Sequence, residues 1–212
     1  IPTAIVNAAT GIESIDAHIN TFYKTGYLHN HIRMYLAAIV CNNAKSHWLA
    51  PARWMYYHLL DGDLASNSCS WQWVAGSFSS KKYYCNQENI NKYTSNQQQQ
   101  TFLDHSYEYI ATMPVPNALE PIGTVDLITI LPPTSVPVLD VTKPTLLYNS
   151  YNLDPNWRAA ENANRVLLLE PSHFKSYPVS EKVIQFIQAL ASNIKDIQIY
   201  TGEVEDLKKH YI

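Results

Sequence analysis

Residues 10–38, TGIESIDAHINTFYKTGYLHNHIRMYLAA, and residues 59–77, LLDGDLASNSCSWQWVAGS, carry the pattern that decides the fold. Apolar residues recur in the first stretch with the spacing of one helix face, at Ile12, Ile15, Ile19 and Phe22. Gly26 follows Thr25 where this face ends, and glycine is a common stop signal for a helix. The opening of the chain therefore predicts amphipathic helices.

Three further helices are predicted from the same spacing. One covers about 28–43, and the next begins at Pro51, because proline favours the first helical turn. The last covers about 64–76. On the helix over 28–43, the side opposite the apolar one carries Asn30, Arg33, Met34 and Ala37.

Arg33 is the only Lys, Arg, Asp or Glu residue within 28–43. An unpaired buried guanidinium is costly, so Arg33 needs a carboxylate partner, and Asp61 and Asp63 are the candidates. From residue types alone, a structural ion pair between two helices is the simpler interpretation. From residue types alone, core packing is likewise the simpler interpretation of Trp71 and Trp73.

The residue pattern predicts no metal site. His29 and His31 lie two positions apart and point in different directions on a helix. Asp61 and Asp63 lack a surrounding cluster of further oxygen ligands. The sequence also has no GxSxG, P-loop or GxGxxG motif.

Three scattered cysteines, without a CxxC pair, favour a reducing compartment over a disulfide scaffold: Cys41, Cys69 and Cys85. The sequence shows no apolar run of membrane-spanning length and no signal-peptide pattern, so we expect a cytoplasmic protein with no membrane partner. Charge is uneven, with seven Lys/Arg against five Asp/Glu in residues 1–94 and eight against thirteen in 95–212. This balance is compatible with DNA contact by the first part, but it is not that of a strongly basic nucleic-acid binder.

The composition divides the chain into three parts. We expect a helical domain over 1–94, a polar and proline-rich connector over 95–144, and a small α/β unit over 145–212. A short strand is expected within the connector at 125–131. The last part has three short apolar runs typical of buried strands and one amphipathic helix that follows Ser180, which predicts parallel pairing.

The two opening stretches together resemble the flavin-domain signature of DNA photolyases and cryptochromes. The family pattern is TGxPxxDAxMRxLxxTGxxHNRxRM followed by DGDLAxNxxxWQW, and the resemblance covers about residues 9–78. It implies a mainly helical FAD-binding domain in which light drives an electron from the flavin to a pyrimidine dimer in DNA, a lyase reaction. The alternatives are a non-repairing light or redox sensor and a cofactor-free structural relative.

The resemblance also implies roles for single residues around FAD. Arg33 and Asp61 correspond to the ion pair beside the isoalloxazine ring, and Asp63 to a carboxylate near the ring and the ribityl chain. Asn67 corresponds to the amide that faces flavin N5, and Asn30 to a residue that touches flavin and substrate.

The remaining implied roles concern electrons and the DNA lesion. Trp71 corresponds to the tryptophan nearest the flavin in the family's electron-transfer chain, and Trp48 to the next one outward. Met34 and Trp73 correspond to residues that line the slot for a flipped dimer. His31 stands on the substrate side, where the family usually has arginine.

The family's phosphate-binding loop and its Trp-x-x-Glu-like helix would precede residue 1. We therefore expect this chain, as a fragment, to hold FAD poorly and to be inactive alone. Residues 164–207 resemble more faintly a strand–helix–strand of the family's amino-terminal α/β domain, and a generic α/β appendage is the simpler interpretation.

Overall fold

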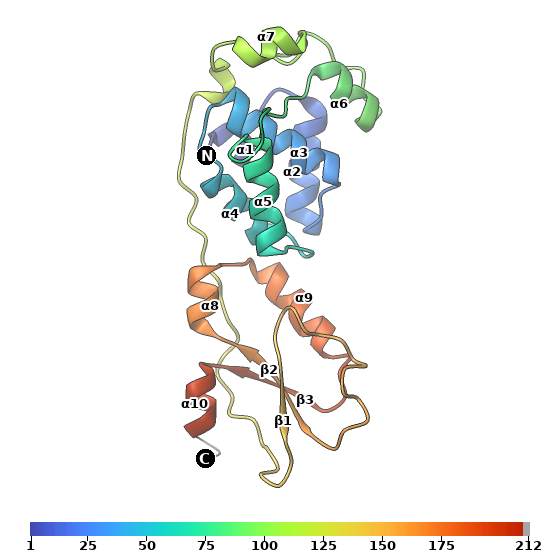
Figure 1. Ribbon diagram of the computed structural model, residues 1–212, viewed down its shortest axis with the longest axis vertical. Helices are drawn as coiled ribbons and strands as arrows, with labels where there is room; N and C mark the ends of the chain where they lie inside the picture. The colour runs from blue at the N-terminus through green and yellow to red at the C-terminus, as the bar shows by residue number, and fades with distance from the viewer. Residues whose placement is uncertain (210–212) are drawn as a thin grey trace. The chain divides into compact units, whose positions relative to one another are not determined.

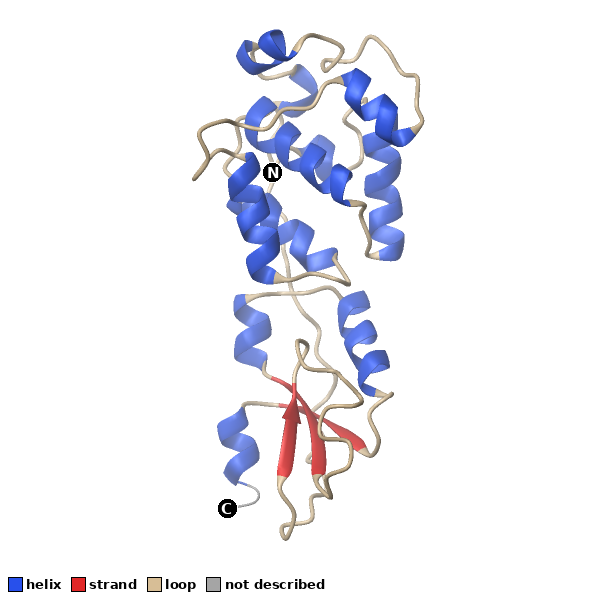
Figure 2. Cartoon of the chain, turned by 45° about the vertical axis from the view of Figure 1, so that its right-hand side comes forward, coloured by secondary structure: helices blue, strands red, loops and turns tan. Residues whose placement is uncertain are grey.

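The computed structural model describes residues 1–209. Contacts divide the chain into two compact units, Ile1–Asp126 and a second unit that begins at Leu127 (Figure 1). The first unit is helical and the second contains all the described strands, as Figure 2 shows in red. The predicted fold class, mainly helical with a small α/β part, is confirmed.

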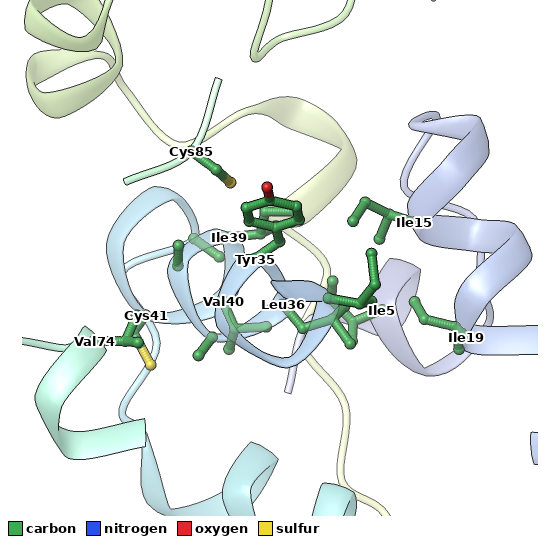
Figure 3. Packing of buried hydrophobic residues seen from close by; sticks show 14 of the residues in the cluster. Ile5, Ile15, Ile19, Tyr35, Leu36, Ile39, Val40, Cys41, Val74 and Cys85 are labelled. Carbon is green, nitrogen blue, oxygen red and sulfur yellow. The ribbon is translucent and has the colours of Figure 1, made fainter. Parts of the chain in front are cut away.

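The first unit consists of short helices around one core. In chain order these are α1 (Thr3–Val6), α2 (Glu13–Thr25), α3 (Asn30–Ala38), the π-helix η1 (Ile39–Asn43), α4 (Leu49–His58), α5 (Leu64–Val74), α6 (Gln87–Thr94), α7 (Tyr107–Thr112) and the 3-10 helix η2 (Asn117–Leu119). α5 packs against both α3 and α4. Figure 3 shows part of the core, where Ile5, Leu36 and Val40 meet.

The turn from α2 into α3 is bonded to the segment that precedes Asp61. Gly26 ends α2 with φ of 70°, and its carbonyl accepts a hydrogen bond from the amide of Leu60 at 2.9 Å. A Cβ atom at Gly26 would lie 2.6 Å from the Leu60 side chain. Glycine is therefore required both by the backbone conformation and by the close approach of the chain before Asp61.

The predicted helix over 28–43 is continuous but not uniform. Its last five residues form a π-helix in which every residue is buried. Within this turn, the Asn42 side chain donates to the carbonyls of Val74 at 2.9 Å and Tyr83 at 2.7 Å. The turn thereby fixes the end of α5 and the extended segment that follows it.

The expected connector over 95–144 is shared between the two units. Its first part packs with the helices, since Gln98 in the glutamine run accepts from the amide of Glu13 and donates to the carbonyl of Gly11, both at 2.8 Å. α7 and η2 lie in this part, and α6 lies in the polar stretch before it, where no helix was predicted.

The second unit contains a three-stranded parallel sheet in the order β1 (Thr145–Tyr148), β2 (Asn164–Leu169) and β3 (Ile197–Thr201). Its helices are α8 (Pro171–Ser176), α9 (Glu181–Ala191) and α10 (Val204–Lys209). The predicted parallel pairing and the helix after Ser180 are confirmed. The strand expected at 125–131 is wrong, because this extended segment bonds through the Thr129 hydroxyl to Val179 rather than through a backbone ladder.

Among residues 1–209, no helix is long and apolar enough to span a lipid bilayer.

Candidate functional site

A cavity of about 420 Å³ opens among α3, α4 and α5 in the first unit. α3 contributes four residues, α5 contributes seven, and the rest come from α4, from the turn before α5 and from the loop after it. Its wall consists of Asn30, Arg33, Met34, Ala37, Met55, Leu59, Asp61, Asp63, Ser66, Asn67, Cys69, Ser70, Trp71, Trp73, Val74 and Phe78. Eight of the ten site residues predicted from the sequence therefore meet in one place.

The Arg33–Asp61 ion pair forms part of this wall. Nη2 of Arg33 donates to both carboxylate oxygens of Asp61, at 2.9 and 2.8 Å, and Nε donates to the carbonyl of Leu28 at 2.9 Å. The sequence left Asp61 and Asp63 open as partners, and the structure selects Asp61. The two side chains are 24% and 54% exposed, so this is not a deeply buried ion pair.

Asp63 has a local structural role as well as its place on the wall. It is the N-cap of α5, and its Oδ1 accepts from the amide of Ser66 at 2.6 Å. An acidic N-cap satisfies a free amide and complements the helix dipole. The second carboxylate oxygen has no hydrogen-bond partner among the described residues and is available at the cavity.

Asn67 lies one turn further along α5. Its Nδ2 donates to the carbonyl of Ala52 at 2.9 Å, which orients the amide and leaves Oδ1 as an acceptor. Asp63, Asn67 and Trp71 follow one another at four-residue intervals, and all three line the cavity, as the sequence spacing predicted.

The two tryptophans of WQW differ in exposure. Trp71 is 2% exposed and belongs to the core cluster, so it is at once core and cavity wall. Trp73 is 44% exposed, and its ring lies 5.9 Å from that of Tyr83.

The family model of the FAD-binding domain of DNA photolyase matches residues 3–118, which is more than half of the chain. The chain belongs to this DNA photolyase family.

Several curated relatives of this photolyase-family chain share one name. Deoxyribodipyrimidine photo-lyase of Agrobacterium fabrum is 37% identical over 68 residues, which are 32% of this chain and 14% of the relative. The enzyme of the same name from Synechococcus is 36% identical over 75 residues, or 35% of this chain and 16% of that protein. The enzyme of the same name from Escherichia coli is 36% identical over 66 residues, which are 31% of this chain and 14% of that protein. The matched segment thus spans about a seventh of these relatives. No solved structure matches the chain.

Two predicted site residues do not line the cavity of this photolyase-family domain. Trp48 precedes α4 and is half-buried against the core, with the His47 ring at 5.6 Å. His31 lies between His29, at 5.2 Å, and Tyr93, at 4.4 Å between ring centroids. Since the imidazole stacks on these rings, it takes a different position from the cavity-lining side chains of the same helix.

Sequence reasoning missed several residues of the cavity wall. Ser66 and Ser70 share the helical stripe of α5 that includes Asn67, so the spacing could have identified them. Met55 and Phe78 come from separate segments, and only the fold brings them to the wall. Phe78 is 63% exposed at this position. Within residues 1–209, no group of three or more His, Cys, Asp and Glu side chains could hold a metal ion.

Proposed function

We propose that this cavity holds the isoalloxazine ring of FAD. We further propose that the chain forms part of an enzyme that uses light to repair pyrimidine dimers in DNA. The observation that carries the proposal is the Arg33 guanidinium, held on the cavity wall by Asp61 and by the Leu28 carbonyl. The family membership supports the cofactor, and the name of the curated relatives supports the reaction.

The chemistry of the wall fits a flat ring with a polar edge. Apolar side chains suit the faces of such a ring, and they include Met34, Ala37, Leu59 and Val74. The amides of Asn30 and Asn67 and the carboxylate of Asp63 supply hydrogen-bonding groups for its edge. When bound, FAD supplies light-driven one-electron chemistry.

Arg33 has a defined electrostatic role in this proposal. Because Arg33 uses Nη2 for Asp61 and Nε for the Leu28 carbonyl, its Nη1 group remains to donate to a negatively charged ligand in the cavity. One N–H of the Asn67 amide donates to the Ala52 carbonyl, which leaves the second N–H as a donor and Oδ1 as an acceptor for the ligand.

Trp71 and Trp48 are proposed to carry electrons towards the cavity. Trp71 lies on the wall, in direct reach of a ligand there, and Trp48 stands outside it as the next donor. Met34 and Trp73 are proposed to receive the lesion, since an apolar side chain and an exposed indole suit a flipped pyrimidine dimer. His31 would contact the DNA outside the cavity.

The test is FAD binding by this chain and by an amino-terminally extended form, followed by absorbance spectroscopy after removal of free flavin. Arg33→Ala should lose the flavin. Arg158→Ala is the matched control, because it breaks an exposed arginine–carboxylate pair with Glu161 in the second unit. Retention of FAD at wild-type stoichiometry in Arg33→Ala would contradict the proposed site.

Repair is tested separately by illuminating the FAD-loaded longer form with dimer-containing DNA. Loss of the dimers under blue light supports the proposed reaction. Flavin binding and photoreduction without dimer loss would instead identify a light or redox sensor. A longer form that binds no FAD would identify a cofactor-free relative.

A further inference from the structure

Another cavity, of about 370 Å³, lies in the second unit, and residues at the start of all three strands line it. Each start supplies one basic side chain. Lys143 stands two residues before β1, Arg165 is the second residue of β2, and Lys195 stands two residues before β3. Figure 2 shows the three strands in red. Because they are parallel and begin at the same edge of the sheet, three basic residues far apart in the sequence meet at one cavity.

The opposite edge of this sheet, where the strands end, is closed by the chain itself. In open parallel sheets a ligand commonly lies at the carboxyl ends of the strands. Here the carboxylate of Glu203, which follows β3, accepts from the amide and from the hydroxyl of Ser172, both at 2.8 Å. The chain's own carboxylate thus takes up the donors that follow β2, and the cavity at the amino ends is the candidate ligand site of this unit.

Arg165 supplies a buried positive charge to this cavity. It is only 7% exposed, and it forms no ion pair with any carboxylate of residues 1–209. Its Nη1 donates to the carbonyl of Ala163 at 3.2 Å, and its Nη2 lies within 3.3 Å of three further carbonyl oxygens in residues 158–161. These bonds hold the loop around the guanidinium but leave its net charge in place. Since a buried charge is costly without a partner of opposite sign, its position favours an anionic ligand.

The other charges at the cavity keep the excess positive. Lys195 is exposed and forms no ion pair within the described part of the chain, and Lys143 pairs with Asp140 at 3.2 Å. The acidic residues of the wall are Glu161 and Asp196, and the first of them is paired with an arginine outside the wall. With these outside partners included, four basic side chains stand against three acidic ones.

We propose that this cavity binds the phosphate group of a small molecule, with Lys195 and Lys143 as its contacts and Arg165 as the buried charge. Basic side chains that converge from three strand starts suit the several oxygens of a tetrahedral phosphate better than a planar carboxylate. Ala160 and Asn162 also line the cavity, and their amides have no acceptor among the described residues, so they are available as further donors. The cavity is within the size range of small-molecule sites and is large enough for a mononucleotide.

The test uses the full chain in a phosphate-free buffer of low ionic strength, with inorganic phosphate and AMP as the two probes. Isothermal titration calorimetry should show one site for AMP. Inorganic phosphate should displace AMP more effectively than chloride does at the same ionic strength, because the site recognises the phosphate group. Tighter binding of AMP than of phosphate would identify a nucleotide as the ligand, and equal affinities would identify the free ion; either result supports the proposal.

Two lysine variants separate this site from general surface charge. Lys195→Gln should weaken both probes at least several-fold, whereas Lys208→Gln should leave both affinities unchanged. Lys208 is the matched control, because it is an exposed lysine on α10 that pairs with Glu205 and does not line the cavity. Since Lys195 is exposed, we expect its variant to keep the unfolding midpoint of the unaltered chain.

The absence of binding by both probes would overturn the proposal, as would equal losses of affinity in Lys195→Gln and Lys208→Gln. AMP that binds Lys195→Gln at full affinity would lie elsewhere on the chain, which would also overturn it. Neither probe contains a flavin, and Lys195 belongs to the second unit. Failure of the chain to bind FAD therefore leaves this result intact, so the two proposals fail independently.

Discussion

Arg33 and Asp61, which are 28 positions apart in the sequence, are joined by two hydrogen bonds from one guanidinium nitrogen to both carboxylate oxygens. Neither side chain is buried, and the pair lies on the wall of the cavity. Exposed ion pairs contribute little to stability, about 1 kcal/mol at most. This small contribution to stability supports the proposed role of the pair in ligand binding.

Asp61→Asn separates these two roles. We expect the free energy of unfolding to fall by about 1 kcal/mol or less. FAD affinity of the amino-terminally extended form should fall at least about tenfold, equivalent to about 1.4 kcal/mol. Chemical denaturation and flavin titration measure the two quantities. Glu161→Gln is the control, because it breaks the exposed pair with Arg158. It should lower stability no more than Asp61→Asn does and should leave FAD affinity unchanged. Equal losses of FAD affinity in both variants would refute a specific role for Asp61.

Gly26→Ala should be strongly destabilising, because it combines a φ of 70° with a Cβ atom 2.6 Å from the Leu60 side chain. The matched control is Gly11→Ala, since Gly11 has φ of 81° but no atom within 4 Å of the added Cβ. Left-handed strain alone costs about 1–2 kcal/mol, so Gly11→Ala measures it. Thermal unfolding of both variants should show the larger loss for Gly26→Ala, and an equal loss would mean that the contact with Leu60 relaxes freely.

Asp63→Ala should destabilise α5 by about 1 kcal/mol, because the amide of Ser66 loses its acceptor. Asp63→Ser keeps a side-chain oxygen at the N-cap but removes the charge at the cavity. We therefore expect Asp63→Ser to retain most of the stability and still to weaken FAD binding in the longer form. Denaturant unfolding and flavin titration together would show this; unimpaired binding in Asp63→Ser would assign the carboxylate to the helix alone.

The three thiols should differ in reactivity. Burial raises the pKa of Cys41 and of Cys85 to about 12, whereas Cys69 is exposed. Because the thiolate is the reactive form, only Cys69 should react quickly with a disulfide reagent near pH 8 in the folded protein. All three should react after unfolding, and Cys69→Ser should abolish the fast reaction.

The raised pKa values of Cys41 and Cys85 also predict how the free energy of unfolding changes with pH. An unfolded thiol has a pKa of about 8.5, so above that pH the unfolded chain releases protons that the folded chain retains. The contribution of Cys41 and Cys85 is therefore complete below about pH 8.5 and declines as the pH rises towards 12. Denaturant unfolding between pH 7 and pH 10 should show this decline, and Cys85→Ala should reduce its slope.

The sequence was sufficient for features that depend on local spacing. The apolar stripe of α2, the stop at Gly26 and the shared face of Asp63, Asn67 and Trp71 all follow from helical periodicity. It was insufficient where partners come from distant segments. Phe78 reaches the cavity through the fold, and α6 depends on an Asn86 cap within a stretch so polar that no helix was predicted there.

The π-helix at Ile39–Asn43 gives the domain an unusual sensitivity to chain length. A π turn contains one residue more than the α-helical turn it replaces, and each helical residue turns the chain by about 100°. Deleting one residue there would restore a regular helix and carry the Asn42 amide away from the carbonyls of Val74 and Tyr83. The fold should thus tolerate a point substitution in this turn better than the deletion of one residue. The deletion would rotate the helix before this turn relative to all the contacts that follow it.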